Sequence, residues 1–246
     1  MADTPVHLVI GAAGAIGSAT VHRLAEAGAR VVVSGRDEAA LERLADDLDA
    51  DVRPVDARDW QAVQELVSGV VEHHGRLDGV ANLAGSVLLK PAHLTSQEEF
   101  EATIATTLST AFAVVRAAAP AMKQAGGSIV LASSAAAQIG IGNHDAIAAA
   151  KAGIDGLVRS AAATYGPKGV RVNAVAPGLV SSKLTEALLS SESQAEGSRK
   201  LHVLGRLGEG DDVAAAVAWL LDPTTSWVTG QIIGLDGGLG QVRSRG

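Results

Sequence analysis

The stretch VIGAAGAIGSAT, residues 9–20, joins a short β-branched run to a helical segment and carries Gly11, Gly14 and Gly17. A turn without side chains lets a pyrophosphate approach backbone N–H groups, and the positive end of the next helix stabilises its charge. Here the pattern opens a βαβ unit, the context in which it indicates dinucleotide binding. The alternative is that the glycines only allow close helix–strand packing. We expect Gly11, Gly14, Ile16 and Gly17 to bind a cofactor.

The residues that end the second expected strand indicate which dinucleotide is bound. An acidic residue there usually holds the adenosine 2′-hydroxyl, but this chain has Gly35 followed by Arg36. A guanidinium suits a phosphomonoester, so the sequence favours NADP(H) over NAD(H). The alternative is a solvated surface arginine that Asp37 partly neutralises.

β-Branched runs alternate with Ala-rich helical segments along the whole chain. The expected strands are residues 6–10, 30–34, 51–55, 77–83, 127–133, 169–175 and 231–235. Strands that alternate with helices predict a parallel sheet covered on both faces. We therefore expect an α/β, single-domain Rossmann fold over residues 1–246, with a doubly wound seven-stranded parallel sheet. Thr95 and Glu98 have the spacing of a capping box at the start of a long helix that runs toward Lys123.

Composition excludes several classes of function. The 27 acidic and 20 basic residues are interspersed, so no basic run exists to bind nucleic acid. Cysteine is absent, the first ten residues do not resemble a signal peptide, and no apolar stretch is expected to cross a membrane. We expect a cytoplasmic protein with no bound metal.

A polar, Ser-rich segment at residues 181–205 interrupts the alternation. Because it follows the carboxyl end of the sixth expected strand, we interpret it as a substrate lid, and its alternative is a plain surface insertion. Residues 183–189, KLTEALL, supply apolar side chains suited to a small hydrophobic substrate.

Taken together, these stretches and several others resemble the short-chain dehydrogenase/reductase family from about Val6 to Gly238. Besides the glycine turn, the resemblance rests on Asp56, ANLAG (81–85), the serines at 133 and 134, Lys151, VRVNAVAPG (170–178), GRLGEGDDV (205–213) and GQIIGLDGG (230–238). Any one of these could occur by chance, whereas the ordered series is specific.

The resemblance implies roles for individual cofactor-binding residues. Asp56 would accept from the adenine amino group, and Lys151 would hydrogen-bond the nicotinamide ribose. The remaining implied contacts are Asn82, Ala84 and Gly85 on the adenosine ribose side, and Pro177, Gly178 and Val180 at the nicotinamide. Asp56, Asn82 and the Pro177–Gly178 pair have structural alternatives as turn or strand-end residues.

The same convergence follows from the residues themselves. Ser133 and Ser134 end the fifth expected strand, and Lys151 lies two turns into the next helix. Their side chains should meet at the carboxyl edge of the sheet, where open α/β sheets bind ligands. Ser134 and Lys151 are therefore the catalytic candidates.

The chain departs from the family pattern at two positions. Counting thirteen residues from Ser134, or four back from Lys151, places Ile147 where the family usually has a tyrosine that donates a proton. An isoleucine side chain can neither donate nor accept a hydrogen bond. Thr107 stands where the family usually has an asparagine of the proton relay.

His144 is the alternative acid. It precedes Ile147 by three residues and should share its helix face, whereas the only tyrosine, Tyr165, lies about 27 Å along the helix. Histidine exchanges protons near neutral pH. The alternative is a helix-start histidine with no chemistry, and Asp145 is expected to interact with the helix dipole.

Three functions fit these observations. The first is an NADP(H)-dependent oxidoreductase whose proton comes from His144 or from a water held by Ser134. The second is a cyclase, dehydratase or isomerase without net hydride transfer, and the third is a cofactor-binding protein without catalysis. Because the expected cofactor-binding residues are retained, the first function is favoured. We also expect self-association as a homotetramer or dimer through residues 97–124, 143–165 and the C-terminal strand.

Overall fold

The computed structural model describes residues 4–46, 48–186 and 192–242. Its seven strands form one parallel sheet in the order β3-β2-β1-β4-β5-β6-β7, which confirms the predicted doubly wound Rossmann fold. The strands are β1 Val6–Ile10, β2 Arg30–Ser34, β3 Asp51–Val52, β4 Gly79–Asn82, β5 Gly127–Ala132, β6 Val170–Pro177 and β7 Ile232–Leu235. Strand order reverses between β1 and β4, and such a switch point places a crevice at the carboxyl ends of the strands.

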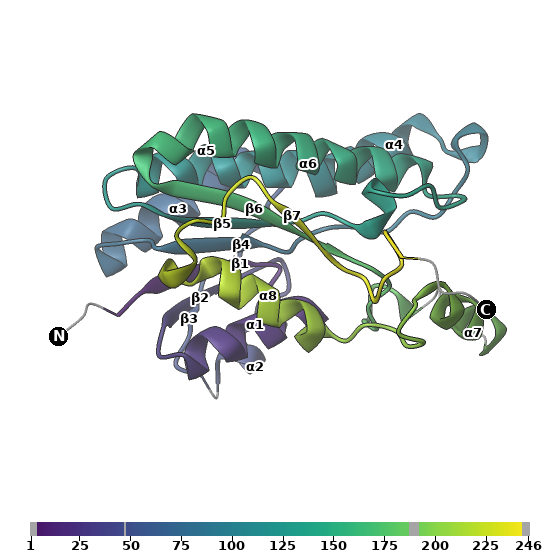
Figure 1. Ribbon diagram of the computed structural model, residues 1–246. Helices are drawn as coiled ribbons and strands as arrows, with labels where there is room; N and C mark the ends of the chain where they lie inside the picture. Colours follow the sequence, from purple (N-terminus) through teal and green to yellow (C-terminus); the bar gives the residue numbers. More distant parts are fainter. Residues whose placement is uncertain (1–3, 47, 187–191, 243–246) are drawn as a thin grey trace.

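Helices cover both faces of the sheet (Figure 1). They are α1 Ala15–Glu26, α2 Glu38–Ala45, α3 Trp60–His74, α4 Gln97–Ile104, α5 Thr110–Met122, α6 Asp145–Tyr165, α7 Glu192–Leu201 and α8 Gly210–Leu221. Side chains alternate along β1, so Leu8 and Ile10 pack with α3, α5 and α6, while Val9 packs with α1, α2 and α8. Small residues fill both layers, as the scarcity of aromatic residues predicts.

Four expected strands are shorter than the sequence suggested, two of them by three residues. Residues 51–55 form only the two-residue strand β3, although the Arg53 N–H still donates to the carbonyl of Val33 at 3.0 Å. Val55 rejoins the edge through a hydrogen bond from its N–H to the carbonyl of Gly35, at 2.9 Å. Likewise, residues 77–83 contribute only Gly79–Asn82.

The start of the long helix differs from the prediction by one residue. Ser96, not Thr95, caps it: the Ser96 hydroxyl accepts from the Glu99 N–H at 3.2 Å, and Glu99 accepts from the Ser96 N–H at 2.9 Å. Thr95 instead donates its hydroxyl to the carbonyl of Pro91 at 3.1 Å. The helix then passes through a π-helical turn, Ala105–Ser109, before α5 begins.

This long helix also corrects an expectation about membranes. The continuous segment Gln97–Met122 has the length and hydropathy of a membrane span. The expectation that no apolar stretch of the chain is long enough to cross a membrane was therefore wrong for this segment. In the fold, 56% of its most apolar window is buried inside the protein. Such burial is typical of a core helix, and its apolar character is explained by packing against the sheet and α6.

Candidate active site

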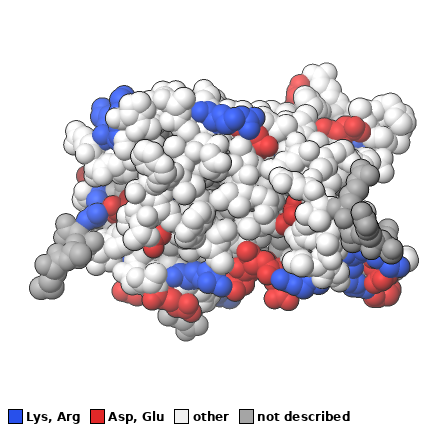
Figure 2. All heavy atoms as spheres, in the orientation of Figure 1, with Lys and Arg blue, Asp and Glu red and all other residues white. Residues whose placement is uncertain are grey.

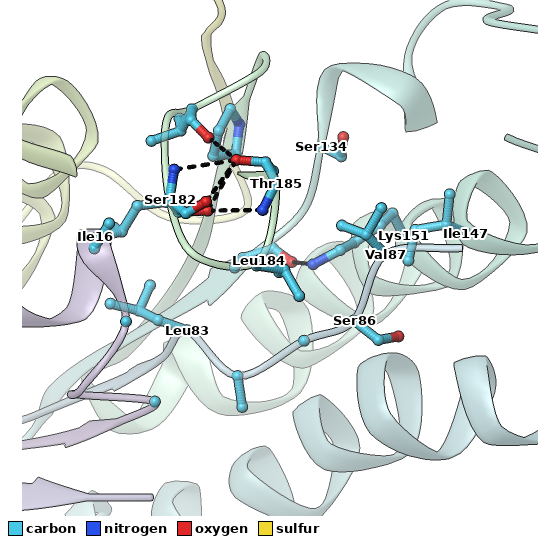
Figure 3. Close-up of a pocket in the computed structure, with 18 of the residues that line it drawn as sticks. Ile16, Leu83, Ser86, Val87, Ser134, Ile147, Lys151, Ser182, Leu184 and Thr185 are labelled. Atoms are coloured by element: carbon cyan, nitrogen blue, oxygen red, sulfur yellow. Dashed lines mark hydrogen bonds between the residues drawn. The ribbon is translucent and has the colours of Figure 1, made fainter. Parts of the chain in front are cut away.

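A cavity of about 1060 Å³ lies at the carboxyl ends of the strands. Its walls come from the β1–α1 turn, the segments after β2, β4, β5 and β6, the start of α6, and residues 182–185 and 197–202. Figure 3 shows Ser134, Ile147 and Lys151 on one side of it and Ile16 and Leu83 on another. This location agrees with the ligand crevice expected for the strand order.

The glycine turn lies at the floor of the cavity against the segment after β4. Gly11 has a φ of +82°, and a Cβ there would lie 2.7 Å from the backbone N of Ala84. A Cβ on Gly17 would lie 2.2 Å from the carbonyl oxygen of Gly11. Gly14 precedes α1, and Ile16 also lines the cavity. The turn therefore leaves backbone and a helix N-terminus facing the space, which fits a pyrophosphate.

Arg36 lines the cavity beyond the end of β2. It forms no ion pair with any residue that the structure describes. Asp37, the expected neutralising partner, instead caps α2 by accepting from the Ala40 N–H at 3.1 Å. The Arg36 guanidinium is thus available to an anionic ligand.

Asp56 also lines the cavity, but its carboxylate is already paired. The Arg58 guanidinium lies 2.5 Å from Asp56 Oδ2, and the Arg58 N–H donates to Asp56 Oδ1 at 3.0 Å. The hydrogen bond from Arg58 lowers the pKa of Asp56 to about 2. Asp56 is therefore both a turn residue and a charged cavity residue, and an adenine amino group would share it with Arg58.

The ANLAG segment positions the far wall. Asn82 is buried at the end of β4, and its Oδ1 accepts from the Ala84 N–H at 3.3 Å. Ala84 and Gly85 line the cavity, and a Cβ on Gly85 would lie 3.4 Å from the ammonium nitrogen of Lys151. Glycine at position 85 consequently keeps the space beside Lys151 open.

Lys151 and Ser133 form a buried polar group between β5 and α6. Lys151 Nζ donates to the carbonyl of Ala132 at 2.6 Å, and burial lowers its pKa to about 8 against the opposing charge of Asp155. The Ser133 hydroxyl donates to Asp155 at 2.5 Å, and burial raises the pKa of that carboxyl. Ser133 is therefore committed to the protein interior.

Ser134 has the opposite character. Its Oγ lines the cavity and accepts from the Ala136 N–H at 3.2 Å. Among the described residues, no acceptor is bonded to its hydroxyl hydrogen. Of the two serines, Ser134 is thus the one that can donate to a ligand.

Ile147 and His144 both line the cavity at the start of α6. Ile147 is buried one turn before Lys151, with 5% of its surface exposed. The Nδ1 of His144 lies 2.8 Å from the carbonyl of Gly142, which can only accept, so Nδ1 carries a hydrogen. Asp145 does more than interact with the dipole, because it accepts from the Ala92 N–H at 3.0 Å.

The π-helical turn gathers hydroxyl groups around Thr107, of which the sequence indicated only Thr107 itself. Thr107 is fully buried there, and its Oγ1 lies 3.3 Å from the Oγ of Ser86, which also accepts from Thr106 at 2.9 Å. Ser86 and Thr106 line the cavity. Since the turn changes the helical period, spacing in the sequence gives no signal for this cluster.

Pro177, Gly178 and Val180 continue β6 into the cavity wall. The Thr185 hydroxyl donates to the carbonyl of Val180 at 2.6 Å and closes residues 180–185 into a loop (Figure 3). Residues 187–191 of the expected lid lie outside the described part of the chain. Beyond them, α7 contributes Gly197, Ser198 and Leu201 to the cavity, and His202 follows it.

One histidine cluster lies away from the cavity. Potential ligand atoms of Asp51, His73 and His74 lie within 4.8 Å of one another at the end of α3. Asp51 already accepts from the Arg53 guanidinium at 3.0 Å and contacts His74 Nε2 at 3.2 Å. Asp51 is therefore already paired, whereas His74 Nδ1 is buried without a hydrogen-bond partner among the described residues. None of the three side chains lines the cavity.

Comparisons with known proteins agree with this geometry. A family model described as Enoyl-(Acyl carrier protein) reductase matches residues 11–240. The 3-oxoacyl-[acyl-carrier-protein] reductase FabG of Thermotoga maritima is 36% identical over 242 residues, which is 95% of this chain and 97% of that protein. A tropinone reductase homologue of Arabidopsis thaliana is 35% identical over 241 residues, covering 94% and 91%.

Solved structures show the same relationship. The crystal structure of an actinorhodin polyketide ketoreductase variant with NADPH superposes with a TM-score of 0.92 and 28% identity, and covers 98% of each chain. The range matched by the family model, residues 11–240, includes the glycine turn, Lys151 and β7. This chain is a member of the short-chain dehydrogenase/reductase family.

Proposed function

We propose that this protein is an NADP(H)-dependent oxidoreductase of small hydrophobic carbonyl compounds or the corresponding alcohols, whose proton donor is not tyrosine. One observation carries the proposal: Ser134, Ile147 and Lys151 line the same cavity as the glycine turn. A substrate beside a cofactor held by that turn would lie against a hydroxyl, an ammonium and an apolar side chain.

The cofactor preference is supported by Arg36, whose guanidinium faces the cavity without an ion pair in the described chain. A phosphomonoester accepts bidentate hydrogen bonds from such a group. That a ketoreductase of the same fold was crystallised with NADPH agrees with this preference.

The nicotinamide supplies the hydride when bound, so the protein has to hold the carbonyl and deliver a proton. Ser134 supplies an O–H that has no acceptor among the described residues and would bind the carbonyl oxygen. Lys151 supplies the proton through this hydroxyl or a water beside it, because burial lowers its pKa to about 8. His144, which lines the same cavity, remains an alternative donor.

Apolar side chains around the reacting position support a hydrophobic substrate. They are Val87, Leu89, Ile141, Ile147, Leu184 and Leu201. We propose that residues 181–205 cover this substrate as a lid, within a single domain. A non-redox cyclase, dehydratase or isomerase is the second candidate, and it is favoured by the burial of Ile147, which would leave the reacting carbon without an acid.

The proposal includes a cytoplasmic homotetramer or dimer without nucleic-acid, membrane or metal partners. On the face in Figure 2 the charges of both signs are mixed and the centre is largely uncharged. Trp227, which precedes the edge strand β7, has 98% of its surface exposed, and burial of such a side chain would favour self-association. A monomeric mass in solution would count against this part.

The function is tested by titrating NADPH and NADH through nicotinamide fluorescence, then measuring turnover of a ketone panel. We expect tighter NADPH binding and slow reduction. Ile147→Tyr should raise turnover by about 10² to 10⁴, the usual contribution of a general acid. Ile147→Phe is the matched control, since it adds the ring without the hydroxyl and should not raise turnover.

Other outcomes discriminate the alternatives. Failure of the wild type to bind either nucleotide would overturn the proposal. Binding without turnover would favour the non-redox reading, and rescue by Ile147→Tyr would then identify a disabled reductase. Loss of activity in His144→Ala, with Ser134→Ala and Lys151→Arg active, would make His144 the donor.

A further inference from the structure

His202 occupies a junction between three segments of the cavity. It directly follows α7 and is buried, with 4% of its surface exposed. A Cβ on Gly178 would lie 2.6 Å from its Nε2, and one on Gly237 would lie 3.4 Å from its Cβ. The imidazole therefore packs between the segments that follow β6 and β7.

The hydrogen bonds of His202 fix its protonation state. The backbone N–H of Leu179 donates to Nε2 at 3.1 Å, so Nε2 carries a lone pair. Nδ1 lies 2.8 Å from the carbonyl of Ser198, which can only accept, so Nδ1 carries the hydrogen. Both bonds are made only by the neutral ring with its hydrogen on Nδ1.

These two bonds link different parts of the site. Ser198 belongs to α7 and lines the cavity, while Leu179 follows Gly178 on the segment expected at the nicotinamide. We propose that neutral His202 is a positioning residue that joins α7 to the Gly178–Leu179 backbone and thereby retains the cofactor, and that its protonation breaks this join. The part of this inference that concerns the cofactor rests on the proposed function. The two hydrogen bonds of His202 that join α7 to Leu179 do not depend on it.

Protonation acts through a conflict between two donors. A hydrogen on Nε2 would point at the N–H of Leu179, and a buried N–H without an acceptor is unfavourable. Histidine is the side chain whose charge ordinarily changes at mildly acidic pH. The charged groups that line the same two hollows as His202 include Lys183 after β6, Asp236 after β7, and Arg206 and Asp212 beyond α7; Arg199, on α7, precedes His202.

Neighbouring charges are largely committed elsewhere. Asp236 accepts from the N–H groups of Gly238 and Gly240, at 2.9 and 2.8 Å. Arg199 pairs with Glu192 and Glu196, and Arg206 with Asp212 at 2.6 Å. No carboxylate of the described chain is bonded to the His202 ring, so a protonated ring gains no counter-ion within hydrogen-bond distance.

The test measures the Kd of NADPH between pH 7.5 and 5.5 for four proteins. In the wild type, Kd should rise about tenfold on acidification, which corresponds to one hydrogen bond. His202→Gln, whose amide offers both a donor and an acceptor, should change less than about threefold. His202→Leu should bind about tenfold more weakly throughout.

His22→Gln is the matched control. His22 makes the same kind of bond, from Nδ1 to the carbonyl of Ser18 four residues before it, but it is exposed and has no second hydrogen-bond partner among the described residues. This variant should follow the wild-type pH profile. An unchanged pH profile in His202→Gln would overturn the proposal.

A measurement on the cofactor-free protein tests the hydrogen bonds of His202 separately from their effect on cofactor binding. In a ¹⁵N spectrum of the cofactor-free protein, the signals of the His202 ring are those that are missing from His202→Gln. Their chemical shifts should show that the ring hydrogen is on Nδ1 at pH 7.5. The Leu179 amide should then lose hydrogen-exchange protection at pH 5.5. The opposite tautomer, or unchanged protection, overturns the join. If the wild type binds no NADPH, the proposed function and the role of His202 in retaining the cofactor are both overturned. The hydrogen bonds of His202 are still tested by the ¹⁵N and hydrogen-exchange measurements.

Discussion

Lys151 Nζ donates its hydrogen bond to the carbonyl of Ala132, the last residue of β5, rather than to a carboxylate. Asp155, one turn further along α6, is engaged by the Ser133 hydroxyl. The ammonium group therefore lies in a buried setting with little local compensation, and its pKa is lowered to about 8.

The first prediction concerns this lysine. Carbonyl reduction should slow as pH rises through about 8, because the neutral amine has no proton to deliver. Lys151→Arg stays charged but does not release its proton, so turnover should fall by about 10² to 10⁴. NADPH fluorescence should show binding within about threefold of wild type. Full activity in Lys151→Arg would exclude Lys151 as the proton source.

Arg36 gives the second prediction. Arg36→Gln should weaken NADPH binding by about 10- to 100-fold and leave NADH binding unchanged, because only the 2′-phosphate is lost as a partner. Arg43→Gln, an exposed arginine of α2, is the control for a loss of general positive charge. Equal weakening in both variants would make Arg36 an ordinary surface charge.

The third prediction separates two glycine positions. Gly17→Ala places a Cβ against the carbonyl of Gly11, so the turn has to shift; we expect a loss of about 1 to 3 kcal/mol in unfolding free energy and weaker NADPH binding. Gly69→Ala, in α3, meets no atom within 4 Å and should be stabilising by about 0.5 to 1 kcal/mol. Urea unfolding measures both. Normal stability and binding in Gly17→Ala would contradict the tight turn.

His7 provides the fourth prediction. Burial lowers its pKa from 6.5 to about 4, against the opposing charges of Asp78 and Asp222. Below pH 6.5 the unfolded chain therefore takes up a proton that the folded chain refuses, and stability falls. Between pH 7 and 5 this costs about 2 kcal/mol.

His7→Asn removes that titration. The variant should be less stable than wild type at pH 7, so the quantity compared is the change in unfolding free energy between pH 7 and 5. This change should be smaller in His7→Asn than in wild type by about 2 kcal/mol. Identical changes in the two proteins would show that His7 does not contribute to acid sensitivity.

The parts of the fold that follow simple periodicity could be predicted from sequence. The alternation of strands and helices predicted the order of elements, and the glycine turn predicted where the cavity would open. The predicted length of β3 was wrong, although Arg53 and Val55 still bond to β2 beyond it. The predicted helix start was wrong because Thr95 and Ser96 are both capable caps. The exact ends of helices and strands depend on local contacts between neighbouring residues, and the spacing of residue types in the sequence does not reveal those contacts.

The candidate site divides in the same way. Positions of Arg36, Ser134, Ile147 and Lys151 around one cavity could be expected from their places at strand ends and on α6. The pairing of Asp56 with Arg58 and the place of His202 could not, because both depend on contacts within irregular segments. A buried histidine shortly before the GRLG motif gives no periodic signal.

The π-helical turn at Ala105–Ser109 lies between α4 and α5. Its i→i+5 hydrogen bonds close a turn that holds one residue more than an α-helical turn, so the extra residue is accommodated while both flanking helices keep their phase. Removing one residue from the turn would therefore restore a regular helix, and the Ser96 cap and Thr103 would keep their faces. The hydroxyl groups of Thr106 and Thr107 would be displaced instead, because they lie within the turn itself.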